Sequence, residues 1–186
     1  SAEEFDHRVV NAFEALESAV EAGKIQMYGM ATWNCFRNNA DAKDYLALTR
    51  VIGLAEKAGG KNHSFKVIQL PLNLGMSEAL SNANQPAQGH QHNILEVAQD
   101  LGITVICSAS VLQGQLSRDL PPVIAEPFTG LDTDAERSLQ FVRSTPGVTT
   151  ALVGMKQQKH VEENLATARV APAPWEQYSK LFQANE

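Results

Sequence analysis

The residues with the clearest chemical potential lie where an expected strand ends and an expected helix begins. The apolar run 151–153 stops at Gly154, and a helical pattern containing Glu163 and Asn164 follows after a short loop. The first backbone N–H groups of a helix have no intrahelical partner, and they attract phosphate and other anions. In a barrel of parallel strands, a phosphate site commonly lies over the last two strands. The sequence therefore predicts a phosphate-binding junction here.

Composition and charge limit the class of protein. The chain has 186 residues, of which 44% are hydrophobic and 19% charged, which is typical of one globular domain over residues 1–186. The formal net charge of −6 gives no electrostatic reason to expect nucleic acid or an anionic membrane as a partner. No apolar run is long enough to span a bilayer, and no signal peptide pattern is present. Cys35 and Cys107 make no disulfide framework, so a cytoplasmic location is expected.

Apolar periodicity indicates alternating helices and strands. The expected helices are 3–22, 45–58, 94–101, 132–144, 160–167 and a last helix from Pro174, and the expected strands are 25–32, 65–70, 103–109 and 149–153. Asn93 is expected to cap the third helix. The polar stretch 75–92 is expected to be a flexible loop or a lid over a site.

The order of these elements is compatible with two architectures. One helix precedes four strand–helix units whose strands begin about 40 residues apart, the spacing of parallel βα units. Four such strands fit a doubly wound open sheet, or half of a (β/α)8 TIM barrel (its strands 5–8) with an extra C-terminal helix. An open dinucleotide-binding sheet has a glycine-rich turn after its first strand. Residues 32–37 (TWNCFR) contain no glycine, so the half-barrel is favoured.

Four segments resemble the C-terminal half of the aldo-keto reductase family, whose members are NADP(H)-dependent (β/α)8 barrels. Residues 21–32 (EAGKIQMYGMAT) are similar to the family's GKIRYIGVSN, and residues 67–74 (VIQLPLNL) to its VVQVEYNL. Residues 103–116 (ITVICSASVLQGQL) resemble ITVIAYSPLGQGLL, and residues 154–165 (GMKQQKHVEENL) resemble GTSSPEHLEENL. The four segments keep the family's order and spacing over nearly the whole chain.

The resemblance implies that three positions lie at the nicotinamide. Gln69 matches the glutamine that hydrogen-bonds the carboxamide. Thr32 stands where the family has an asparagine, and Ser108 where it has the tyrosine that stacks on the ring. Just past the first strand, Trp33 and Asn34 are expected to line the pocket of a small carbonyl substrate.

The resemblance also implies contacts with the rest of the cofactor. The loop after the third strand matches the segment that covers the pyrophosphate, with Ser110, Val111, Gln113 and Gly114. The contacts with ribose, 2′-phosphate and adenine are implied for Gly154, Met155, Lys156, Gln157, His160, Glu163 and Asn164. Lys156 suits the 2′-phosphate because a cation beside a helix N-terminus favours a phosphate monoester.

The family's catalytic Tyr, Lys, Asp and His all lie on the first four strands of the barrel, and nothing here matches them. Tyr28, Tyr45 and Tyr178 occur outside the catalytic context. We therefore assign no catalytic residue, and we expect the chain alone to be inactive because it supplies no tuned proton donor. No metal site is expected either, since His90 and His92 have no Cys or acidic partner at ligand spacing.

Half a barrel has open edges, which predicts a partner. The partner is expected to be the N-terminal half of the same barrel or a second copy of this chain. The first residue is Ser1 rather than methionine, which suggests a piece of a longer protein. Three functions remain open: the cofactor-binding half of a carbonyl-reducing or alcohol-oxidising enzyme, a non-catalytic half-barrel that binds or regulates, and a phosphate-handling lyase or aldolase of another barrel family.

Overall fold

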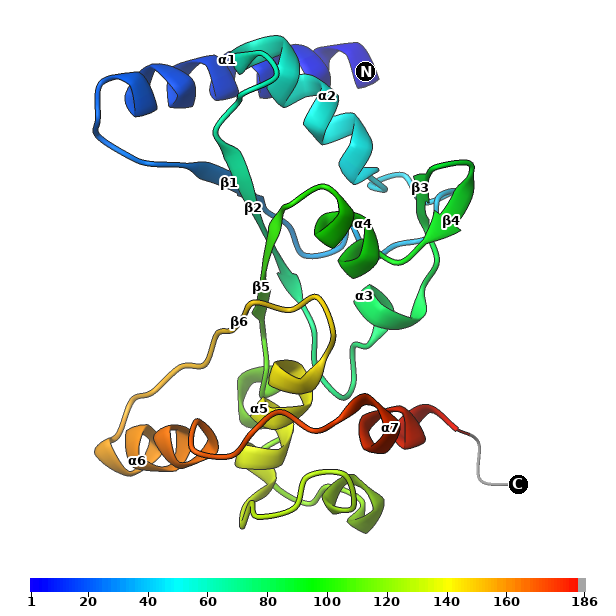
Figure 1. The fold of residues 1–186 in the computed structure, drawn as a ribbon, viewed down its shortest axis with the longest axis vertical. Helices are drawn as coiled ribbons and strands as arrows, with labels where there is room; N and C mark the ends of the chain where they lie inside the picture. Colours follow the sequence, from blue (N-terminus) through cyan, green and yellow to red (C-terminus); the bar gives the residue numbers. More distant parts are fainter. Residues whose placement is uncertain (184–186) are drawn as a thin grey trace.

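The centre of the fold is a sheet of four parallel strands (Figure 1). The computed structural model describes residues 1–183. The strands are β1 (Tyr28–Ala31), β2 (Phe65–Pro71), β5 (Thr104–Ser108) and β6 (Thr150–Ala151), and their spatial order is the same as their chain order. Because all four strands are parallel, the loops that follow them lie at one end of the sheet, and β2 and β5 run toward the bottom of Figure 1. The predicted parallel α/β architecture is confirmed.

Helices separate the strands as expected. They are α1 (Ala2–Glu21), α2 (Leu48–Gly59), α4 (Ile94–Asp100), α5 (Asp134–Ser144), α6 (Gln158–Thr167) and the single turn α7 (Trp175–Tyr178). Asn93 caps α4 in a capping box with Glu96, which confirms the predicted cap. Within residues 1–183, no helix combines the length and the apolar character needed to cross a bilayer.

The two faces of the sheet differ in burial. Ile68 and Val105 point toward the helices and are fully buried. The register pairs Gln69 with Ala31 and with Ile106, so these three side chains share the opposite face, which is partly exposed. In a closed barrel this face is packed by layers of side chains from all the strands. With only four strands, the face that carries Ala31, Gln69 and Ile106 is not covered in this way.

Helix α1 is anchored at the amino end of the sheet. The Phe13 ring lies 5.1 Å from the ring of Tyr28 and 5.3 Å from that of Phe65. One turn on, the Glu17 carboxylate accepts hydrogen bonds from the Tyr28 hydroxyl (2.8 Å) and from the Ser64 backbone N–H (2.7 Å) and hydroxyl (2.9 Å). Burial opposes the charge of Glu17, but these hydrogen bonds outweigh it and lower the pKa of the carboxyl group.

Several expected boundaries are wrong. Residues 25–27 and 152–153 lie outside their strands, since the pairing of β1 with β2 begins at Tyr28 and the pairing of β6 with β5 ends at Ala151. The second helix begins at Leu48 rather than at residue 45, because Tyr45 belongs to a loop in which its hydroxyl donates to the Asn84 carbonyl oxygen (2.7 Å). The helix expected from Pro174 is short: α7 continues only as the 3₁₀ helix Ser179–Phe182.

The segment 75–92, expected to be a flexible loop or a lid over a site, contains regular structure that the sequence did not predict. It contains the short helix α3 (Glu78–Ser81) and a hairpin of β3 (Gln85–Ala87) with β4 (His90–His92). Asn84 and Gln85 are buried, and both side-chain amides donate to the Phe36 carbonyl oxygen, over 2.9 and 3.2 Å. These bonds hold the segment against the loop that follows β1.

Candidate cofactor-binding site

A cavity of about 810 Å³ lies beyond the carboxyl ends of β5 and β6. Its walls come from the loop after β5, the start of α5, the residues after β6 and residues 159–164 of α6. The volume is within the range of small-molecule and cofactor sites. Among the sequence-predicted cofactor residues, the structure brings together at this cavity Val111, Gln113, Gly114, Gly154, His160, Glu163 and Asn164.

The other residues predicted for the adenosine half do not border the cavity. Met155, Lys156 and Gln157 are exposed and lie in the loop before α6. Lys159, one residue into the helix, lines the cavity instead. Because α6 begins at Gln158, Lys159 belongs to its first turn and Lys156 precedes it. A cation is therefore present at the cavity wall, at a different position from the one the sequence predicted.

Sequence reasoning missed several residues of the cavity wall, above all those at the start of α5. The missed lining residues are Ser117, Asp132, Thr133, Ala135, Glu136, Leu152, Val153 and Lys159. The signal was present in the sequence, since Thr133 and Glu136 form a capping box, in which the Glu136 carboxylate accepts from the Thr133 backbone N–H (2.9 Å). The Thr133 hydroxyl also donates to the Glu163 carboxylate over 2.6 Å.

Polar side chains of α5 hold α6 and the segment after it in place. Arg143 donates to the carbonyl oxygens of Thr167 (2.6 Å) and Val170 (3.3 Å), which satisfies groups at the carboxyl end of α6. Gln140 donates to the Ala171 carbonyl oxygen over 2.6 Å. The wall that carries His160, Glu163 and Asn164 is therefore fixed relative to α5.

The loop after β5 has an unusual backbone. Ala109, Leu112 and Gln113 all have positive φ (57°, 44° and 55°), a conformation that side chains with a Cβ rarely adopt. Such strain persists where surrounding contacts impose it. Here the Asn73 amide donates to the Ala109 carbonyl oxygen (3.0 Å), and the buried Ser110 hydroxyl donates to the Leu152 carbonyl oxygen (2.8 Å). Both contacts tie this cavity-lining loop to the ends of neighbouring strands.

The three residues predicted for the nicotinamide lie at the carboxyl ends of their strands. The Thr32 backbone N–H donates to the Gln69 carbonyl oxygen (2.9 Å), and the Leu72 N–H donates to the Ser108 carbonyl oxygen (3.2 Å). The Thr32 hydroxyl oxygen is buried, and no described residue offers it a hydrogen bond. An orphaned buried hydroxyl beside a half-buried glutamine fits a ligand with both donor and acceptor groups, as a carboxamide has.

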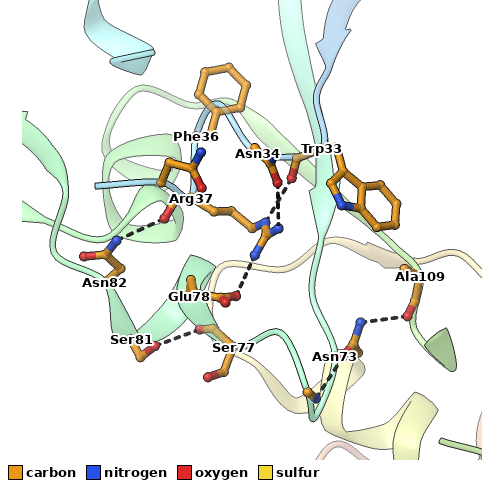
Figure 2. Close-up of polar contacts among 12 residues, drawn as sticks. Trp33, Asn34, Phe36, Arg37, Asn73, Ser77, Glu78, Ser81, Asn82 and Ala109 are labelled. Carbon is orange, nitrogen blue, oxygen red and sulfur yellow. Dashed lines mark hydrogen bonds and ion pairs between the residues drawn. The ribbon is translucent and has the colours of Figure 1, made fainter. Parts of the chain in front are cut away.

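Trp33 and Asn34, predicted for the substrate, lie in the loop after β1, and Figure 2 shows both beside Arg37. The Trp33 residue is 54% exposed, while its carbonyl oxygen accepts a hydrogen bond from the Arg37 Nε atom (3.0 Å). The Asn34 side-chain oxygen accepts from another nitrogen of the same guanidinium (3.4 Å). One buried arginine thus contacts both predicted substrate residues.

The three tyrosines are all engaged elsewhere. Tyr28 donates to Glu17, and burial together with this hydrogen bond raises its pKa. Burial also raises the pKa of Tyr45, which donates to the Asn84 carbonyl oxygen. Tyr178 is fully buried, and its hydroxyl lies 2.7 Å from that of Thr145.

In the part of the chain that the structure describes, no group of three or more His, Cys, Asp or Glu residues could hold a metal ion.

Comparison with known proteins rests on structure. No protein-family model matches the chain, and no curated protein is significantly similar to it in sequence. Among solved structures, a thermostable aldo-keto reductase in complex with the inhibitor epalrestat matches with a TM-score of 0.66 and 16% identity, over 93% of this chain and 53% of that chain. The chain has the fold of about half an aldo-keto reductase barrel.

Two further aldo-keto reductases support this assignment of the fold. One from Klebsiella pneumoniae in complex with NADPH matches with a TM-score of 0.64 and 21% identity, over 94% of this chain and 54% of that chain. The holo form of one from Bacillus halodurans matches with a TM-score of 0.59 and 18% identity, over 91% of this chain and 54% of that chain. This chain spans about half the length of the solved structures that it matches.

Proposed function

We propose that this chain is the C-terminal, cofactor-binding half of an NADP(H)-dependent aldo-keto reductase, and that the complete protein reduces a small carbonyl compound or oxidises the corresponding alcohol. The observation that carries the proposal is the cavity at the ends of β5 and β6. Two segments about 40 residues apart, each similar to a cofactor-binding segment of the family, meet there.

Different residues of this chain would bind different parts of the cofactor. Lys159 and His160 provide positive or donor groups for a phosphate, and Glu163 and Asn164 provide acceptor and donor groups for the base. Gln69 and the unpaired Thr32 hydroxyl would fix a carboxamide at the strand ends. When bound, NADPH would supply the hydride for the reaction. The contribution of this chain is to orient the nicotinamide ring and to hold the phosphates.

The proton donor comes from outside this chain in our proposal. The hydroxyls of Tyr28, Tyr45 and Tyr178 all have partners within the fold, and burial raises the pKa of each group. The inner face of the sheet, with Ala31, Gln69 and Ile106, is partly exposed. We propose that the N-terminal half of the barrel covers this face and carries the acid.

Titration with NADPH and NADH, followed by cofactor fluorescence, tests the proposal. The complete protein should bind NADPH more tightly than NADH and oxidise it when a carbonyl compound is added. The 186-residue chain alone should not turn over. Absence of NADPH binding by the complete protein would contradict the proposal, and binding without turnover of any carbonyl compound would favour a non-catalytic module.

A further inference from the structure

Arg37 lies among the loops that carry the predicted substrate residues Trp33 and Asn34, and neither the strand pattern nor the cofactor site accounts for it. Its side chain is 6% exposed, although a guanidinium is costly to bury without partners. Figure 2 shows the side chain running between the loop after β1 and helix α3. The cost is offset because the guanidinium has three acceptors on two separate segments of the chain.

The three acceptors use the planar fork of the guanidinium. Nε donates to the Trp33 carbonyl oxygen (3.0 Å), one terminal nitrogen donates to the Glu78 carboxylate (2.6 Å), and the other donates to the Asn34 side-chain oxygen (3.4 Å). Lysine cannot reproduce such an arrangement, because its ammonium is a compact point charge. Arg37 thus fixes both the backbone of Trp33 and the orientation of the Asn34 amide.

The same two segments are joined at further points. The Asn82 amide donates to the Arg37 carbonyl oxygen (3.0 Å), and the Asn84 amide donates to the Asn38 carbonyl oxygen (2.6 Å). The Gln85 side chain accepts from the Leu48 backbone N–H over 2.8 Å. Residues 33–38 and 77–85, which follow neighbouring strands, therefore form one hydrogen-bonded unit.

We propose that Arg37 is a positioning residue, which holds Trp33 and Asn34 in place as a preformed wall of the substrate pocket through its link to Glu78. This inference rests on the proposed function, because the wall has a substrate only if the complete protein acts on a carbonyl compound. Because Arg37 holds the Asn34 side-chain oxygen, the N–H groups are the part of this amide left for a substrate, and the exposed Trp33 offers an apolar surface. Arg37 itself is too buried to contact a substrate.

The test uses the complete protein with NADPH and a nitrobenzaldehyde as the carbonyl probe. Arg37→Lys and Arg37→Gln should each raise KM about tenfold and leave kcat and the NADPH Kd within about twofold, since only the placement of the substrate wall changes. Glu78→Gln keeps an acceptor for Arg37 and should raise KM less. The matched control is Arg50→Gln, which removes a surface ion pair with Asp6 (2.8 Å) between α1 and α2 and should change none of these constants.

Hydrogen exchange provides a second readout that needs no substrate. In Arg37→Lys, peptides covering residues 33–47 and 77–85 should exchange faster together, whereas in Arg50→Gln neither should change. An unchanged KM, or an equal loss of kcat and cofactor affinity, would overturn the positioning role. If the probe is not turned over, independent exchange of the two peptides would overturn it. Failure of wild-type protein to bind NADPH would instead count against the proposed function.

Discussion

The Thr133 hydroxyl donates a hydrogen bond of 2.6 Å to the Glu163 carboxylate, joining the start of α5 to α6 across the wall of the cavity. Thr133 is at the same time the N-cap of α5, where its side-chain oxygen accepts from the Glu136 backbone N–H (3.2 Å). The Thr133 hydroxyl therefore caps α5 and also orients Glu163, a residue of the proposed adenine site.

Replacement of Thr133 tests both effects, each with its own measurement. Thr133→Val removes the hydroxyl and should lower the free energy of unfolding by about 1 kcal/mol through loss of the cap. It should also weaken NADPH binding about fivefold, because Glu163 loses its orienting hydrogen bond. Thr133→Ser keeps both hydrogen bonds and is the control. Urea unfolding and NADPH titration of the two variants would show the difference, and equal NADPH affinity in both would refute the role given to Glu163.

Two lysines, Lys156 and Lys159, are alternative candidates for the phosphate ligand. The sequence pattern assigns it to Lys156, whereas the cavity is lined by Lys159. We expect Lys159→Gln to weaken NADPH binding about tenfold with little effect on NADH, because a charge-assisted hydrogen bond to phosphate is lost. Lys156→Gln should have the smaller effect. Titrations of both variants with both cofactors decide between the residues, and the reverse order would restore the sequence-based assignment.

The Glu17 carboxylate makes stability depend on pH. Its hydrogen bonds from Ser64 and Tyr28 lower its pKa below the ordinary value of 4.5, so the unfolded chain binds the proton more tightly. The stabilisation is therefore present above pH 4.5 and is lost as the pH falls through the folded-state pKa. Glu17→Gln should destabilise the protein near neutral pH, with a difference from wild type that shrinks on acidification.

Unfolding by urea at several pH values measures this difference. Glu14→Gln is the matched control, since Glu14 lies on the same helix and its side chain is exposed. A gap between Glu17→Gln and wild type that stays constant from neutral to acidic pH would show that the Glu17 charge plays no part.

The sequence was sufficient for the order of strands and helices because local periodicity encodes it. Ile68 and Val105 lie in apolar runs whose burial follows from parallel strands covered by helices. The capping box at Thr133 was equally readable, but its partner Glu163 lies thirty residues away and only the folded chain brings them together. The resemblance pointed to both cofactor segments, but the contact between Thr133 and Glu163 depends on the folded chain and could not be predicted.

The segment 75–92 and the choice of lysine illustrate the same limit. Composition alone made 75–92 a polar loop, whereas its structure depends on buried amides, such as those of Asn84 and Gln85, that bond to carbonyl oxygens near residue 36. Whether Lys156 or Lys159 lines the cavity depends on the residue at which α6 begins. Helix ends are the least certain result of pattern reasoning, and an error of two residues changes which side chain reaches a ligand.

The open inner face of the sheet predicts how the chain behaves without a partner. Ile106 lies on this face beside Gln69, so it would be buried only when further strands close the barrel. The chain alone should self-associate and bind a hydrophobic dye, and adding the N-terminal half should reduce both.

Replacement of Ile106 tests this face directly. Ile106→Lys should lower self-association and abolish assembly with the N-terminal half, because a charge cannot enter a packed interior. Val123→Lys, at an exposed position in the 3₁₀ helix Pro122–Ala125, should change neither. Sedimentation measures association, and a clean monomer that melts cooperatively without its partner would contradict the half-barrel interpretation.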